Sequence, residues 1–333
     1  MKKILIIGGA GYVGTVVTSH FLKLGIKVNV LDNFVYDNYF SVSSFIGDPF
    51  YKIFKGDFGD KKVLDKCTDG VDQVFLLAGL VGDPITKNYP MESEFINEIQ
   101  IKKCIDYFDN KNIEKLIFIS TCSNYGLIKE HELADENFKL NPLSLYANAK
   151  VNTEKYILSK KGKTNYSGVI LRFATAFGLS PRMRFDLTIS EFTRDLFFKE
   201  KLVVFDEHTW RPYCHIRDFA RLLEAVYFID SAKVNFEIFN AGGDKNNFTK
   251  QMILDCITKN LDECNIVFNQ NDSDPRNYRV SFKKVKEILD FEPIFSIEEG
   301  VEELIQALKI GLYNDSLINK NLYGNYSINY KIK

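Results

Sequence analysis

Tyr146 and Lys150 are the two side chains whose types and spacing most clearly suggest chemistry. Residues four apart share one face of a helix, so a phenol and an ammonium group would point into the same space. A cation beside a phenol stabilises the phenolate and lowers its pKa, which makes a usable general base. The spacing alone is common, because Tyr-x-x-x-Lys also begins at Tyr51, Tyr107, Tyr125 and Tyr156. Position favours Tyr146, since it lies early in a predicted helix, 142–161, that follows a buried strand and a helix-starting sequence.

A second group of reactive residue types, Ser120–Gly126, lies at the exit of the strand predicted over 115–119. A hydroxyl there could hydrogen-bond a substrate alcohol that Tyr146 deprotonates. Without further context, a strand end rich in Ser and Thr is more often a turn with local hydrogen bonds. The residues themselves leave both interpretations open.

A glycine turn near the start of the chain predicts a place for a diphosphate. An uninterrupted apolar run over 4–7, behind Lys3, is typical of a strand buried on both faces of a parallel sheet, and a helical pattern begins directly after the turn. Glycine lets the backbone turn tightly and approach a ligand, and a helix N-terminus offers unpaired N–H groups to an anion. The alternative is a turn that merely lets the helix pack. The residues expected to hold the diphosphate are Gly8, Gly11, Tyr12, Val13 and Gly14.

Acidic residues at the ends of the next two predicted strands fit the rest of a dinucleotide. Asp32 is placed to accept hydrogen bonds from an adenosine ribose. Asn33 follows it instead of a basic residue, so a 2′-phosphate would meet an uncompensated carboxylate, which favours NAD over NADP. Asp57 could hydrogen-bond an adenine amino group with Phe58 beside the ring, although a plain polar turn is the alternative.

The elements predicted to position these residues are strands that alternate with helices along the chain. Helical periodicity appears at 91–109 and 142–161, and short connections link the elements. Such alternation predicts an α/β fold, a Rossmann-type doubly wound parallel sheet, with ligands beyond the carboxyl ends of its strands. The predicted strands cover 3–7, 27–31, 51–54, 72–79, 115–119 and 168–173.

The pattern of predicted elements changes past residue 178, where helical stretches alternate with short apolar runs. We expect a dinucleotide domain over 1–177, to which residues of about 206–240 return. A smaller α/β substrate lobe is expected mainly over 178–312. The polar tail 313–333 has no hydrophobic period, and its end is expected to be disordered.

The composition describes an ordinary globular chain of 333 residues, 45% hydrophobic and 26% charged. A formal net charge of −1 argues against a nucleic-acid or membrane-surface protein. No apolar run approaches the ~20 residues of a membrane span, and the apolar start is too short for a signal peptide. The 6 cysteines show no metal-site spacing, so we expect reduced thiols, no metal and a cytoplasmic location.

Taken in order, these motifs and the stretch Arg211–Asp218 make the chain resemble a known family over nearly its whole length. The family is the extended short-chain dehydrogenases/reductases of the nucleotide-sugar epimerase/dehydratase type. The resemblance implies that Tyr146 is the general base, that Lys150 holds the nicotinamide ribose and that Thr121 binds the reacting hydroxyl. It also implies that Phe173 lies near the nicotinamide.

The same resemblance implies a substrate diphosphate held by Arg211, with Arg276 or Arg279 assisting. An arginine fork suits phosphate oxygens better than a lysine does. Considered alone, Arg211 beside Trp210 would be a stacked surface residue. Further expected contacts with the cofactor are Leu77, Ala78, Gly79, Val81 and Ser120. Further expected contacts with the substrate are Asp83, Cys122, Ser123, Thr175 and Arg182.

The family pattern also narrows the predicted reaction. Its 4,6-dehydratases carry an acid pair after the active-site threonine, where this chain has Cys122 and Ser123, so dehydration is disfavoured. The stretches 80–84 and 180–186 resemble a branch that includes GDP-heptose C4 dehydrogenases from bacterial capsule gene sets. We therefore predict NAD-dependent oxidation at C4 of a nucleotide-activated sugar, GDP-heptose or a similar NDP-hexose.

Alternatives remain at this point. If the 4-keto sugar turns over in the site and hydride returns to its other face, the enzyme is a 4-epimerase of the UDP-glucose 4-epimerase type. A 4-keto-sugar reductase would favour NADPH, which Asp32 disfavours, and an NAD-sensing regulator would usually lack the Tyr–Lys pair. The helices 91–109 and 142–161 resemble those of the family's dimer interface. Because Ile96, Ile101 and Cys104 widen an apolar face, we expect a homodimer.

Overall fold

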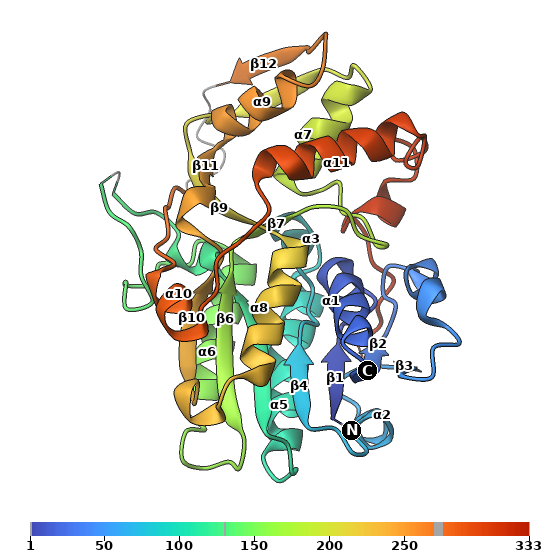
Figure 1. The fold of residues 1–333 in the computed structure, drawn as a ribbon, viewed down its shortest axis with the longest axis vertical. Coiled ribbons are helices and arrows are strands. Elements are labelled where there is room, and N and C mark those ends of the chain that lie inside the picture. Colours follow the sequence, from blue (N-terminus) through green and yellow to red (C-terminus); the bar gives the residue numbers. More distant parts are fainter. Residues whose placement is uncertain (1, 130, 270–275, 333) are drawn as a thin grey trace.

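The computed structural model describes residues 2–129, 131–269 and 276–332, and a seven-stranded parallel sheet forms its centre (Figure 1). The strand order is β10-β6-β5-β4-β1-β2-β3, and every pairing is parallel. The strands are β1 (Lys3–Ile7), β2 (Lys27–Asp32), β3 (Tyr51–Lys55), β4 (Gln73–Leu76), β5 (Lys115–Thr121), β6 (Ser167–Phe173) and β10 (Glu237–Ala241). The predicted fold class is confirmed.

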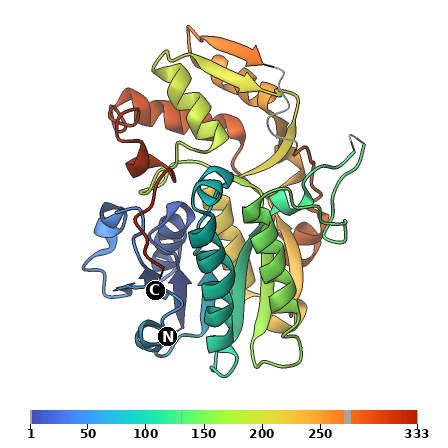
Figure 2. The same ribbon diagram turned by 180° about the vertical axis from the view of Figure 1, so that it is seen from behind.

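The apolar run of β1 is buried on both faces because helices cover the sheet on each side. Alternate side chains of a strand point to opposite faces. Ile4 and Ile6 join a core with α1 (Tyr12–Lys23) and α8 (Ile216–Phe228), which lie on the near face in Figure 1. Leu5 joins the opposite core, where the helices α2 (Lys61–Cys67), α5 (Ile101–Phe108) and α6 (Leu145–Leu158) pack (Figure 2).

The order of the strands reverses direction at β1. The chain proceeds from β1 to β2 and β3 on one side, and then crosses to β4, β5 and β6 on the other. The connections that leave β1 and β4 therefore diverge over opposite faces, which opens a crevice at the carboxyl ends of the strands. The glycine turn follows β1 directly, so it lies at this crevice.

A smaller lobe lies beyond these strand ends. It contains a three-stranded sheet, β11-β9-β7, and a parallel pair, β12-β8, packed with helices around a separate apolar core. The strands are β7 (Thr175–Phe177), β8 (Leu202–Phe205), β9 (Trp210–His215), β11 (Asn247–Thr249) and β12 (Ile266–Asn269). The helices are α7 (Thr188–Phe197), α9 (Lys250–Thr258) and α11 (Ile297–Lys309), with α10 (Lys283–Leu289) set against the main sheet. Among the described residues, no helix is long and apolar enough to cross a bilayer.

Late segments of the chain return to the main sheet. Within the expected range 206–240, α8 packs on α1 and β10 begins alongside β6, whereas β9 belongs to the three-stranded sheet of the smaller lobe. The seventh strand, β10, extends past the expected limit to Ala241.

The helix expected over 91–109 is divided into three parts. These are α4 (Pro90–Glu94), a π-helical segment Phe95–Gln100, and α5, preceded by the unforeseen short helix α3 (Asp83–Asn88). Ile96, Ile101 and Cys104 are buried inside the single chain, so the argument for a dimer from these residues was wrong. The same chain covers the widened apolar face with its own sheet.

Most of the polar tail packs against the rest of the chain, whereas Lys331 and Ile332 at its described end are exposed. Tyr313 and Asn325 are each 7% exposed, and Ser316 is fully buried. Tyr313 packs edge-on against Phe185, which anchors the tail on the smaller lobe. From there the tail runs back along the blue-coloured N-terminal segments to the C-terminus, as the dark red trace in Figure 2 shows.

Candidate active site

One cavity of about 400 Å³, over the carboxyl ends of the parallel strands, brings most of the predicted site residues together. Both lobes contribute to its walls, so the site requires the whole chain. The predicted cofactor residues that line it are Gly8, Gly11, Tyr12, Val13, Gly14, Asp32, Asn33, Phe58, Leu77, Ala78, Gly79, Val81, Ser120, Tyr146, Lys150 and Phe173. The predicted substrate residues that line it are Asp83, Thr121, Ser123, Thr175, Arg182, Arg211 and Arg276.

The glycine turn has the backbone geometry that a diphosphate site needs. Gly8 has φ +86°, which favours glycine, and a Cβ on Gly14 would lie 2.4 Å from the Gly8 carbonyl oxygen. A Cβ on Gly11 would meet only that same oxygen, at 3.4 Å, so this part of the turn is open beside the cavity. The helix α1 starts at Tyr12 without a side-chain cap, which leaves its first N–H groups for an anion. The turn therefore fits a dinucleotide diphosphate.

Backbone hydrogen bonds fix the Asp32 carboxylate at the end of β2. It accepts hydrogen bonds from the N–H groups of Ala10 at 3.0 Å and Phe34 at 2.8 Å. Burial raises the pKa of Asp32, and these two bonds oppose that shift. Asp57 accepts a hydrogen bond from the Asn33 amide at 2.9 Å, but it lines an adjoining cavity of about 320 Å³ instead of the main one.

Tyr146 and Lys150 project from α6 into the main cavity. The Ser144 hydroxyl caps this helix by accepting from the Ala147 N–H at 3.2 Å, which fixes where the Tyr–Lys turn begins. The Lys150 ammonium donates to the Ile119 carbonyl at 2.7 Å and lies 5.8 Å from the centroid of the Tyr146 ring.

The pKa of the Tyr146 phenol differs from the expectation. Burial raises this pKa, as does the nearby Asp83 carboxylate, while Arg184 and a hydrogen bond with Thr121 oppose the rise. Burial also lowers the pKa of Lys150 to about 7, so its positive charge is weakened near neutral pH. Contrary to the expectation, the pKa of Tyr146 is therefore not lowered in the protein alone, because the desolvation of the buried phenol dominates.

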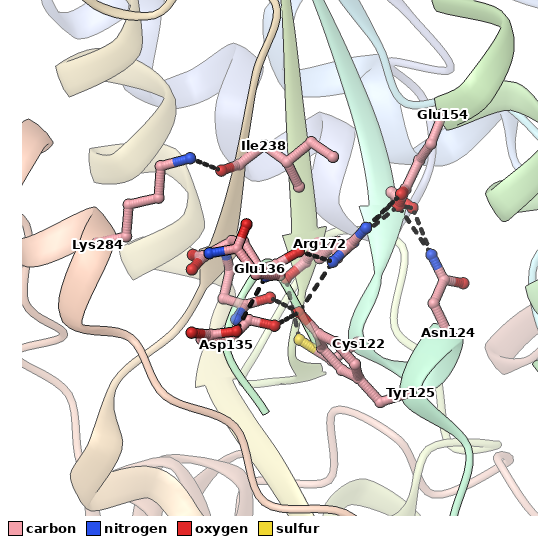
Figure 3. Close-up of polar contacts among 12 residues, drawn as sticks. Cys122, Asn124, Tyr125, Asp135, Glu136, Glu154, Arg172, Ile238 and Lys284 are labelled. Atoms are coloured by element: carbon pink, nitrogen blue, oxygen red, sulfur yellow. Dashed lines mark hydrogen bonds and ion pairs between the residues drawn. The ribbon is translucent and has the colours of Figure 1, made fainter. Parts of the chain in front are cut away.

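A buried polar network joins Glu154, Arg172 and Asn124 (Figure 3). Glu154, one turn after Lys150 on α6, accepts hydrogen bonds from Arg172 at 2.7 to 3.2 Å and from Asn124 at 2.8 Å. It also accepts a short hydrogen bond from the Ser120 hydroxyl. The network thus joins α6 to the exit of β5 and fixes their relative position. Sequence reasoning missed it, although the spacing of Lys150 and Glu154 was a usable signal.

Two predicted substrate residues lie outside the cavity. Cys122 is 1% exposed, and its thiol donates to the Arg172 carbonyl at 3.1 Å, behind the wall of the cavity. Arg279 lies over the Trp210 ring, 5.3 Å from its centroid. Alternate residues of an extended segment face opposite sides, so Arg276 and Tyr278 line the cavity and Arg279 does not. The structure therefore brings neither side chain to the cavity: Cys122 lies in the short helix that follows Thr121, and Arg279 faces away from Arg276 and Tyr278.

Ion pairs bring opposite charges into the cavity wall. Arg276 of the smaller lobe pairs with Asp83 at the start of α3, which links the two lobes across the site. Arg184 pairs with Asp186, with its Nε 3.0 Å from the carboxylate. Arg211 is 7% exposed, donates to the Trp210 carbonyl at 2.7 Å and lies over the Tyr278 ring. It is therefore a buried residue of the site and not a stacked surface residue.

Several lining residues were not foreseen from the sequence. Apart from Lys250 at the start of α9, they lie on loops or on the tail, and none of them belongs to a recognisable motif. They include Tyr36, Arg184, Asp186, Lys250, Tyr278 and Asn325. For the stretch 180–186, the family resemblance predicted a substrate contact for Arg182 but not for Arg184 or Asp186.

Two curated proteins are similar to this chain over most of its length. A Bacillus subtilis protein named uncharacterized UDP-glucose epimerase YtcB is 25% identical, with 92% of this chain and 98% of that protein covered. A UDP-glucuronate 4-epimerase of Thermodesulfobacterium geofontis is also 25% identical, with 92% and 99% covered.

Solved structures share the fold. The UDP-glucose 4-epimerase of Thermotoga maritima, solved with UDP-glucose, superposes with a TM-score of 0.82 at 22% identity, covering 93% of this chain and 99% of that one. The UDP-glucuronic acid 4-epimerase of Bacillus cereus, solved with UDP-glucuronic acid and NAD, gives 0.81 at 22% identity, covering 92% and 99%. Residues 4–242 match the family described as NAD dependent epimerase/dehydratase. The chain therefore belongs to the NAD-dependent epimerase/dehydratase family of enzymes.

Proposed function

We propose that this protein is a nucleotide-sugar 4-epimerase that acts by transient oxidation at the sugar C4. The observation that carries the proposal is that Thr121, Tyr146 and Lys150 line the same cavity as the diphosphate turn. A hydroxyl, a phenol and an ammonium group beside a dinucleotide site are suited to removing a proton from an alcohol while hydride leaves its carbon.

In this proposal Tyr146 accepts the proton of the C4 hydroxyl, and Thr121 holds that hydroxyl by a hydrogen bond. Lys150 binds the nicotinamide ribose, while its bond to the Ile119 carbonyl fixes its position. Bound NAD supplies the hydride acceptor and a positively charged ring that favours the phenolate. Because burial raises the pKa of Tyr146 in the protein alone, the phenol must lose its own proton to solvent when the site fills, before it can accept the proton of the C4 hydroxyl.

The remaining contacts follow from the walls of the cavity. We propose that the glycine turn binds the cofactor diphosphate, Asp32 the adenosine ribose, and Asp57 with Phe58 the adenine. Phe173 stacks on Phe219 with 3.7 Å between ring centroids, which gives a rigid wall for the nicotinamide. The sugar-nucleotide diphosphate would bind beside the guanidinium groups of the smaller lobe. Those proposed for it are Arg211 and Arg276.

Epimerisation is favoured over net oxidation by the relatives. The two curated relatives above are named as a UDP-glucose epimerase and a UDP-glucuronate 4-epimerase, so we propose a UDP-hexose as substrate. The second candidate is net C4 oxidation of a GDP-heptose or a similar sugar. Its support is that Asp83, Arg182, Arg184 and Asp186, from the two stretches that resemble that branch, line the cavity together.

A panel of UDP-, GDP- and dTDP-sugars separates these candidates. An epimerase would convert one of them to its C4 epimer, seen by NMR of the product, without net accumulation of NADH absorbance. A C4 dehydrogenase would release a 4-keto sugar and accumulate one NADH for each product. Absence of turnover with every sugar, by protein that carries NAD, would refute both candidates.

We also propose a homodimer in the cytoplasm. Exposed apolar side chains lie on α4, on the π-helical segment and at the start of α6, at Met91, Ile99 and Leu145 respectively. These side chains, and not the buried Ile96, Ile101 and Cys104, would form a contact between two copies. Sedimentation analysis of the wild-type protein and of a Leu145→Asp variant would test it.

A further inference from the structure

The tail after α11 is attached to the wall of the active-site cavity. The Phe185 N–H donates to the Tyr323 carbonyl at 2.7 Å, and the buried Arg182 guanidinium donates to the Gly324 carbonyl at 2.9 Å. Arg182 is 1% exposed, so this bond lies inside the protein. The tail therefore leaves the smaller lobe at the same stretch that lines the cavity.

Asn325 then reaches across to the dinucleotide domain. Its amide donates to the Val81 carbonyl at 3.0 Å, and both residues line the main cavity. Val81 lies in the connection that leaves β4, close to Gly79 and Asp83. This contact fixes the tail to the loop at the reactive end of the cleft.

The end of the tail meets the other end of the same cleft. Asn329, Tyr330 and Lys331 line the smaller cavity together with Asn33 and Asp57.

Contacts with the π-helical segment hold Tyr330 in that position. Its hydroxyl accepts a hydrogen bond from the Gln100 amide at 3.0 Å, and its ring lies 6.4 Å from that of Phe95. Figure 2 shows this course, from the smaller lobe past the N-terminal segments.

We propose that residues 324–332 form a strap that retains NAD in its site. The strap is anchored at both ends of the cleft, by Asn325 on Val81 and by Tyr330 beside Asp57. A dinucleotide bound between the glycine turn and Asp57 then leaves only when these contacts open. The inference rests on the cofactor and not on the identity of the sugar or the direction of the reaction.

Asn325 is held by a polar contact with a loop, and Tyr330 by a hydrogen bond and a ring contact with the π-helical segment at the edge of the core. Each hydrogen bond stabilises the closed position of the strap only modestly. The loss of two or three of them should therefore speed NAD release about tenfold to a hundredfold. An enzyme that oxidises and then reduces its substrate in each cycle needs to retain its cofactor, whereas an enzyme of net oxidation must exchange bound NADH for NAD.

The experiment measures NAD dissociation from the full chain without any sugar. Protein loaded with labelled NAD is mixed with excess unlabelled NAD, and the bound label is followed over time. The variants are Asn325→Ala, Tyr330→Ala and a chain ending at Gly324. Tyr156→Ala is the matched control, because this tyrosine lies on α6, where it contacts Asp106 and not the tail.

We expect release about tenfold to a hundredfold faster for the truncated chain, about threefold to tenfold faster for Asn325→Ala and Tyr330→Ala, which each lose one hydrogen bond, and an unchanged rate for the control. The melting temperature of NAD-free Tyr330→Ala should change no more than that of the control, because both tyrosines are partly buried at the edge of the same core. Release from both point variants within twofold of the wild-type rate would overturn the proposal. If the truncated chain fails to fold, the point variants decide the outcome.

Discussion

Replacing Glu154 with Gln would leave the Arg172 guanidinium buried beside a neutral amide. The two side chains are 2% and 3% exposed, and Arg172 donates three hydrogen bonds to the carboxylate. The amide of Gln can accept some of these bonds, but its NH₂ group would face the donors of Arg172 or Asn124. A buried cation without a counter-charge is strongly destabilising.

Removing one partner of a buried ion pair costs about 3–5 kcal/mol. Gln keeps the shape and one acceptor oxygen, so we expect the lower end of this range, about 3 kcal/mol. With a urea slope of about 3 kcal/mol per molar, typical of the upper end for small proteins, the unfolding midpoint should fall by about 1 M. The pKa of Lys150 should also fall below about 7, because Glu154 raises it.

Urea unfolding of the NAD-free protein, followed by circular dichroism, measures this loss. Glu287→Gln is the matched control, since Glu287 is an exposed helical residue 3.6 Å from Lys283. Such exposed pairs contribute about 0–0.5 kcal/mol, so its midpoint should remain near that of the wild type. Equal midpoints for Glu154→Gln and Glu287→Gln would refute the reasoning that this network holds α6 to β5.

Three further predictions concern the site. Tyr146→Phe should reduce turnover by ~10²–10⁴ while NAD content stays normal, and near-normal turnover would exclude Tyr146 as the base. The pKa of Lys150 is about 7 in the folded protein, against 10.5 for an ordinary lysine side chain, so the folded state binds fewer protons between these pH values and stability rises with pH there. Lys150→Met should remove that rise. The check is the urea midpoint at pH 7 and at pH 10. An equal change in midpoint between the two pH values in wild type and variant would refute the reasoning. Gly11→Ala should keep the melting temperature of the wild type, because the new methyl group meets only the Gly8 oxygen. The variant should bind NAD at least about tenfold more weakly in calorimetry, since the methyl group adds bulk to the wall of the cofactor site.

The parts of this protein that the sequence predicts well are those with a local pattern. The apolar runs predict the parallel strands because burial on both faces requires such runs. The glycine turn and Asp32 are recognisable because a tight turn and a strand end place them without help from distant residues. Tyr146 could be selected among the tyrosines followed by Lys because its helix follows β5.

Other features depend on contacts between distant segments. The pairing of Arg276 with Asp83 joins two lobes, and nothing in either local sequence signals it. Cys122 faces the core because the chain turns into a short helix directly after Thr121. The rise in the pKa of Tyr146 follows from desolvation by the surrounding walls, whereas sequence reasoning considered only the neighbouring lysine. Asn325 reaches the cavity through the fold of the tail, which has no hydrophobic period to reveal its course.

The position of β10 at the edge of the main sheet also affects how the protein is made. A nascent chain that ends before Glu237 leaves the outer backbone of β6 without its partner strand. A chain that ends before Ile216 also leaves α1 and its side of the sheet without α8, whose Tyr227 packs on Phe21. An unpaired strand edge beside exposed apolar surface promotes association between incomplete chains. Synthesis of the dinucleotide domain is therefore complete only after the first strands of the smaller lobe have been made, and expression of residues 1–177 alone should give aggregates.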